Sequence, residues 1–68
     1  MSIHPVASDW CEFKTDSNYN VHVNRKHLVA FRESTSRTVT LYTNTNQTLI
    51  TQIEVRATAK EIYEWLTA

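Results

Sequence analysis

Hydrophobic and polar residues alternate along most of this chain, and a period of two is typical of strands with one buried face. The first alternating segment covers residues 10–15 and places Cys11 and Phe13 on the same side. Two further segments, 19–24 and 28–34, are rich in strand-forming residues. Polar residues that favour turns follow each of the three segments. The pattern therefore predicts a series of antiparallel strands.

The segment 38–55, TVTLYTNTNQTLITQIEV, predicts a hairpin made of the two most regular strands. The chain contains no glycine, although two-residue hairpin turns usually need the positive φ angles that glycine adopts most easily. Asparagine tolerates that region better than most other residues. We therefore expect Asn44 and Asn46 to form the turn, in a loop of three to five residues.

The period changes near the end of the chain, where a short amphipathic helix is predicted. Thr58 and Glu61 have the spacing of a capping box, in which each side chain accepts a hydrogen bond from the other residue's backbone N–H. Ile62 and Leu66 lie four residues apart and define the apolar side of the helix. So short a helix needs a sheet to pack against.

The fold class predicted from these elements is α+β, an antiparallel β-meander of four or five strands with one C-terminal α-helix packed on one face. We expect an irregular N-terminal leader over residues 1–9 and a single small domain over residues 10–68. Ile62 and Leu66 are expected to cover one face of the sheet. The residues predicted on that face are Val29, Phe31, Val39, Leu41, Leu49 and Ile53.

The opposite face of the predicted sheet is half apolar, which is unusual for the water-facing side of so small a protein. This face mixes apolar side chains with threonines, a glutamine and one arginine. Such a surface is suited to binding a protein partner. The predicted partner-binding residues are Leu28, Ala30, Arg32, Tyr42 and Ile50.

The order of segments resembles the small FlbD/SwrD-like flagellar proteins over about residues 19–66. The resemblance rests on VNRKHLVAFRES, TVTLYTNTNQTLITQIEV and ATAKEIYEWL. The matching positions are Val23, Asn24, Glu33, Thr38, Leu41, Val55 and Ile62. The resemblance implies a small strand-rich fold closed by a helix, and it implies no catalytic residues.

The charges of the chain balance, with seven basic and seven acidic residues, but they are unevenly distributed. Residues 17–56 carry five basic and two acidic residues, a local charge of +3. A basic segment beside sheet aromatics gives an alternative hypothesis, a small regulator that binds single-stranded nucleic acid by charge and stacking. The residues predicted for this alternative are Arg25, Lys26, Arg32 and Arg37.

The residues with reactive side chains do not have the spacing of a metal site or a catalytic site. Cys11 is the only cysteine, so a disulfide within the chain is excluded. His22 and His27 are separated by five positions, whereas zinc ligands usually come in closer pairs. A chain without glycine also has few ways to form a closed pocket lined by backbone donors. We expect no enzyme activity, no metal and no cofactor.

The predicted function is a small non-catalytic protein-interaction module. A 68-residue domain has a small core and often gains stability by self-association, so the expected partners are the protein itself and one unidentified protein. Binding would use the half-apolar face or an unpaired edge strand. The sequence lacks a membrane-span pattern and a signal-peptide pattern, which predicts a cytoplasmic location.

Overall fold

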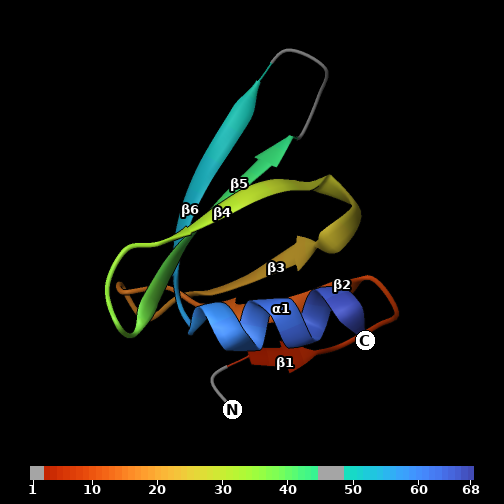
Figure 1. Ribbon diagram of the computed structural model, residues 1–68, viewed down its shortest axis with the longest axis horizontal. Coiled ribbons are helices and arrows are strands. Elements are labelled where there is room, and N and C mark those ends of the chain that lie inside the picture. Colours follow the sequence, from red (N-terminus) through yellow and green to blue (C-terminus); the bar gives the residue numbers. More distant parts are fainter. Residues whose placement is uncertain (1–2, 45–48) are drawn as a thin grey trace.

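The computed structural model describes residues 3–44 and 49–68, which form six antiparallel strands in two three-stranded sheets and one C-terminal helix (Figure 1). Sheet A has the strand order β1 (Ile3–Pro5), β2 (Trp10–Lys14), β3 (Asn20–Asn24). Sheet B has the order β4 (Leu28–Glu33), β5 (Thr38–Asn44), β6 (Ile50–Arg56). The 3₁₀ turn η1 (Arg25–His27) joins the two sheets, and the helix is α1 (Ala59–Thr67). In the described residues no helix is long and apolar enough to cross a membrane.

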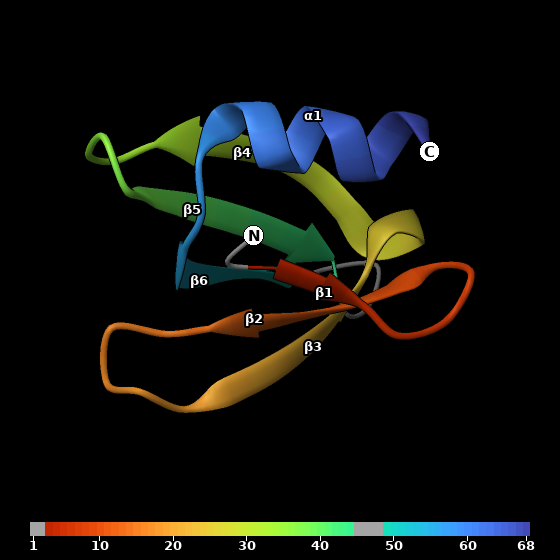
Figure 2. The same cartoon turned by 90° about the horizontal axis from the view of Figure 1, so that it is seen from below.

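The predicted α+β class with a C-terminal helix is confirmed, and the strands number six instead of four or five. They form two sheets because the chain turns sharply after β3. The side chain of Asn24 accepts a hydrogen bond from the backbone N–H of Lys26 at 2.9 Å and caps η1. The turn directs β4 into sheet B, whose inner face lies against α1 and sheet A (Figure 2).

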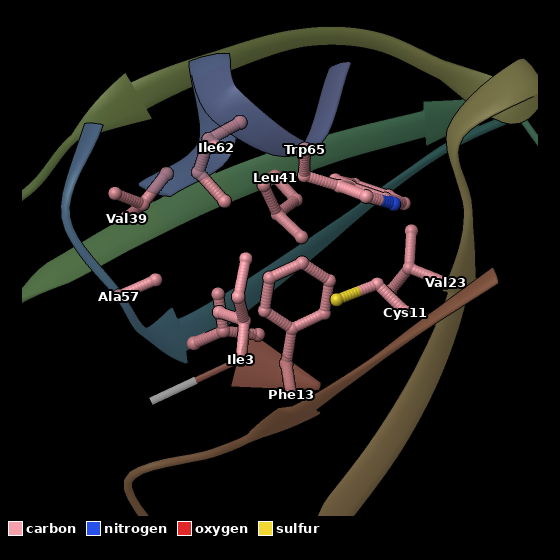
Figure 3. Packing of buried hydrophobic residues seen from close by; sticks show 10 residues of the cluster. Ile3, Cys11, Phe13, Val23, Val39, Leu41, Ala57, Ile62 and Trp65 are labelled. Carbon is pink, nitrogen blue, oxygen red and sulfur yellow. The ribbon is translucent and has the colours of Figure 1, made fainter. Parts of the chain in front are cut away.

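The core lies between the two sheets and the helix (Figure 3). Phe13 is fully buried and meets Trp65 edge to face, with ring centroids 5.4 Å apart. The buried apolar residues are Ile3, Cys11, Phe13, Val23, Val39, Leu41, Val55, Ala57, Ile62 and Trp65. Side chains from strands of both sheets and from α1 therefore stabilise one shared core.

The prediction of an irregular leader is wrong for its first described residues. Ile3–Pro5 forms strand β1, which pairs with β2 so that Ile3 lies opposite Phe13. This register points Ile3 into the core, where only 1% of it is exposed. A strand of three residues that includes Pro5 is too short to show a recognisable alternation in the sequence. The burial of Ile3 in the core holds this strand against β2.

The predicted core face of sheet B is correct at its centre and wrong at the end where β4 and β6 begin. Val39 and Leu41 are fully buried, whereas Val29 and Leu49 are 54% and 61% exposed. The pairing of β4 with β5 shifts register between Leu28 and Ala30, as expected for a β-bulge. The bulge brings Leu28 against the core and leaves Val29 outside it.

The helix begins as its sequence predicts. Thr58 accepts a hydrogen bond from the N–H of Glu61 at 3.2 Å, and Glu61 accepts one from the N–H of Thr58 at 3.0 Å. Ile62 and Trp65 are the buried residues of α1, and Leu66 packs at the edge of the core. The buried side of the helix is therefore defined by Ile62 and Trp65, and the predicted residue Leu66 lies at its margin.

Asparagine does replace glycine at a turn of this chain, in the hairpin between β2 and β3. Asn18 has a φ of 68°, in the left-handed region, and its N–H donates to the carbonyl of Thr15 at 2.9 Å. In the second hairpin, Asn44 ends β5 opposite Ile50. The predicted turn residue Asn46 lies outside the described residues.

Candidate interaction surface

The side of sheet B that points away from the core is the candidate interaction surface. Val39 and Leu41 of the central strand β5 point into the core, so Thr40, which lies between them, and Tyr42, which follows Leu41, point outward. Directly opposed residues of antiparallel strands share a face. The outer face of sheet B therefore consists of Ala30, Arg32, Thr38, Thr40, Tyr42, Asn44, Ile50, Gln52, Glu54 and Arg56.

Apolar side chains lie along one half of this outer face. Tyr42 is half-buried because it sits on the central strand, with Ala30 opposite it on β4 and Gln52 opposite it on β6. Ile50 is 61% exposed and lies one row further along β6, opposite Asn44. The surface thus offers an aromatic side chain and a branched aliphatic side chain to the solvent.

Two opposite charges lie on the next row of the same face. Arg32 and Glu54 are both exposed and lie opposite Thr40, one from each neighbouring strand. Within residues 3–44 and 49–68, neither charge takes part in an ion pair. Thr40 is 6% exposed, and its hydroxyl is 2.8 Å from that of Ser34. The row therefore presents a positive and a negative group on either side of a small polar centre.

Four of the five predicted partner-binding residues share this face, and Leu28 does not. Ala30, Arg32, Tyr42 and Ile50 are placed on it by the strand pairing. The prediction for Leu28 assumed unbroken alternation along β4, and the bulge turns this side chain toward the core instead. The residue that sequence reasoning missed is Glu54, whose relation to Arg32 appears only when the register of three strands is known.

The structure uses Arg25, one of the predicted nucleic-acid-binding residues, to join three parts of the chain. Its Nε donates to the Asp9 carboxylate at 3.1 Å, and its Nη1 donates to the carbonyls of Trp65 and Ala68, each at 3.1 Å. The Arg25 hydrogen bond is the main reason that the pKa of Asp9 lies below its usual value. Lys26 also pairs with Asp9, at 3.4 Å. Both basic side chains are thus near a carboxylate of their own chain.

The other two residues of that set are not gathered with the first pair. Arg25 and Lys26 lie in η1, before the start of β4. Arg32 lies on the outer face of sheet B, and Arg37 follows the opposite end of β4. The four side chains are therefore spread along the whole length of a six-residue strand.

Three of the four edge strands, β1, β4 and β6, are less suited to pairing with another strand. β1 has three residues and ends at Pro5, which has no N–H to donate. The edge of β4 is interrupted by its bulge. β6 is bridged to sheet A where Val55 pairs with Thr15. Short strands, proline and bulges are features that hinder edge-to-edge pairing, so the outer face is a better candidate than these three edges.

The thiol of Cys11 is buried, and the imidazole of His22 is exposed on the outer side of sheet A. Cys11 is fully buried, and this desolvation raises the pKa of its thiol to about 11. His22 is exposed and lies 3.1 Å from the Glu12 carboxylate on the outer side of sheet A. Among the described residues, no three histidine, cysteine or acidic side chains are close enough to hold a metal ion.

A shallow apolar hollow between β4 and α1 is a second surface that the sequence did not predict. Its volume is about 290 Å³, and Phe31 meets Tyr63 edge to face beside it, with ring centroids 5.1 Å apart. Val29 contributes to its lining because the bulge leaves that side chain outside the core. The hollow carries no charged side chain in its lining.

Comparison of the chain with protein-family models, with curated proteins and with solved structures finds no significant match. The resemblance to the FlbD/SwrD-like flagellar proteins therefore stays a prediction. The candidate surface is assigned from the geometry of this chain.

Proposed function

We propose that this protein is a small non-catalytic interaction module that binds protein through the outer face of sheet B. The observation that carries the proposal is the composition of that face. Tyr42 lies one row from Arg32, which has no ion-pair partner in the described part of the chain, and exposed Ile50 extends the apolar part of the same face on β6. Aromatic and arginine side chains are the residues most enriched at the centres of protein interfaces.

The state of the reactive groups supports a non-catalytic role. A thiol with a pKa near 11 stays protonated at neutral pH, and Cys11 has no exposed surface from which to attack a substrate. Among the described residues, the side chain that pairs with His22 is Glu12, on the outer face of sheet A. A binding role needs no such chemistry and uses only the shape and charge of one surface.

Site-specific photocrosslinking in the native host tests the proposal without knowledge of the partner. A photoreactive phenylalanine analogue replaces Tyr42 in one variant and Tyr19 in a matched control. Tyr19 is 71% exposed and follows the turn of sheet A. We expect protein adducts from position 42 and few from position 19. Equal yields at both positions, or none at position 42, would refute the proposal.

A further inference from the structure

We infer that the partner of this face is a second copy of the chain, packed face to face about a two-fold axis that runs parallel to β5. The inference rests on the proposed function, since it names the occupant of the same surface. It is carried by the symmetric placement of two opposite charges, Arg32 and Glu54, about the central strand.

The first step concerns the geometry of the charged row. Arg32 of β4 and Glu54 of β6 both lie opposite Thr40, so they stand at the same height along the sheet. Neighbouring strands are about 4.8 Å apart, which places the two residues roughly 10 Å from each other across β5. Arg32 and Glu54 therefore lie at equal distances on either side of β5 and carry opposite charges.

The second step concerns the symmetry that this arrangement permits. Rotation about an axis parallel to β5 places β4 of one copy over β6 of the other at the same height. Arg32 of each copy then faces Glu54 of the other, which gives two intermolecular ion pairs. Rotation about an axis perpendicular to the strands, centred on the same row, instead places Arg32 of one copy over Arg32 of the other, and Glu54 over Glu54. Like charges that face each other disfavour association, so the charges select the axis parallel to β5.

The third step concerns the side chains on the axis. Tyr42 lies on the central strand, so its two copies meet across the axis. Ala30 lies opposite Tyr42 and is small, which leaves room beside each ring. Packed sheets are about 10 Å apart, a gap that side chains of the length of tyrosine, arginine and glutamate fill. The interface would have an aromatic centre and paired charges at its sides, as an isologous contact requires.

The area of the face limits the strength of this dimer. Three strands of about seven residues span an in-plane area on the order of 350 Å². A standard interface buries about 800 Å² of accessible surface on each partner. The dimer should therefore be weak, with a dissociation constant on the order of 0.1 mM. Measurements must extend to about 1 mM protein.

A charge-exchange experiment by sedimentation equilibrium tests the arrangement. Arg32→Glu places carboxylates at both positions of the pair, and Glu54→Arg places guanidinium groups at both. Each single variant alone should dimerise about tenfold less tightly than the wild type, because both intermolecular pairs become repulsive. An equimolar mixture of the two single variants should restore dimerisation to near the wild-type level, since each pair is again attractive. The double variant should also dimerise.

The mixture also controls for folding, because a misfolded variant would not recover when it is mixed with another. The inference would be overturned by a wild-type protein that stays monomeric at 1 mM, or by single variants that weaken the dimer and are not restored by mixing. A dimer indifferent to both charge changes would overturn it too. If position 42 crosslinks a different protein while the purified chain is monomeric, the proposed function stands and this inference fails.

Discussion

The outer faces of the two sheets treat one pair of opposite charges in opposite ways, whereas Arg56 at the end of sheet B pairs with Asp16 at 3.6 Å. On sheet A, Glu12 lies opposite His22, and the two side chains meet at 3.1 Å. On sheet B, Arg32 and Glu54 share a row, but Thr40 stands between them and they form no ion pair among the described residues. A face that pairs its own charges has little electrostatic attraction left for a partner. This contrast is the reason for placing the proposed interface on sheet B.

The two faces also differ in their apolar content. The outer side of sheet A carries one large apolar side chain, Trp10, which is 42% exposed at the start of β2. Its other outward positions in the paired strands are polar: His4, Glu12, Lys14, Asn20, His22 and Asn24. Sheet B places Ala30, Tyr42 and Ile50 on its outer face. The two outer faces therefore differ in apolar content because of which strand positions point outward. The overall composition of the chain does not show this difference.

The largest effect is expected from two neighbouring substitutions on β5, one on each side of sheet B. Leu41→Ala removes a fully buried side chain and should lower the free energy of unfolding by about 2–5 kcal/mol. Tyr42→Ala, on the outer face, should lower it by about 1 kcal/mol or less. Urea denaturation at low micromolar protein, where the chain is monomeric, measures both. Equal losses would contradict the assignment of the two faces.

The next effect concerns Arg25, which ties Asp9 to the end of α1. Arg25→Ala should lower the free energy of unfolding by about 1–3 kcal/mol, because its hydrogen bonds to the carboxylate and to two carbonyls are lost. Arg25→Lys keeps the charge but cannot bridge the three acceptors, so it should recover only part of the loss. Full recovery with lysine would show that charge alone matters.

The same contact predicts a dependence of stability on pH. The hydrogen bond from Arg25 holds the pKa of Asp9 below its ordinary value of 3.8 in the folded protein. The unfolded chain therefore binds the proton more readily. The contribution of Asp9 to stability is present above pH 3.8 and is lost as the pH falls through the lower folded pKa. Urea midpoints measured from about pH 6 to pH 2 should fall less steeply in Asp9→Asn than in the wild type.

A smaller effect is expected at the turn of sheet A. Asn18 has a φ of 68°, so Asn18→Ala should lower the free energy of unfolding by about 1–2 kcal/mol. Asn18→Gly should leave it nearly unchanged, because glycine reaches this conformation without a steric penalty. Neither change should alter dimerisation, because Asn18 is not one of the residues of the outer face of sheet B. Thermal melting and sedimentation of the two variants check these outcomes.

The smallest effect on stability is expected from removing one acid from each outer face. Glu12→Gln should change the free energy of unfolding by at most about 0.5 kcal/mol, because its pair with His22 is exposed. It should leave dimerisation unchanged. Glu54→Gln should likewise leave the stability of the monomer unchanged but weaken the dimer. If the two variants behave alike in sedimentation, the contrast between the sheets fails.

Local sequence signals predicted the elements of this fold well. The alternation placed Cys11 and Phe13 on one face and Val39 and Leu41 on one face, because strand geometry alone sets a period of two. All four residues are buried. The capping box at Thr58 fixed the start of the helix. These features depend on residues close together in the chain, so the sequence carries them directly.

The errors arose where distant contacts decide the outcome. The bulge that exchanges Leu28 and Val29 depends on how β4 meets β5, and alternation gives no sign of it. Ile3 is buried because a neighbouring strand receives it. Arg25 carries an ordinary surface charge in the sequence, and its role depends on acceptors up to 43 positions away. The candidate site was predicted in four of its positions, and Glu54 needed the register of three strands.

The most direct test of the central claim compares the two outer faces in one experiment, a dilution series of the wild-type protein followed by two-dimensional ¹H–¹⁵N NMR. From about 1 mM to 0.02 mM, the backbone signals of Arg32, Tyr42 and Glu54 should shift along a single binding curve. The signals of Glu12 and His22 should stay in place, because sheet A pairs its own charges. Shifts confined to sheet A, or no shifts on either sheet, would contradict the account.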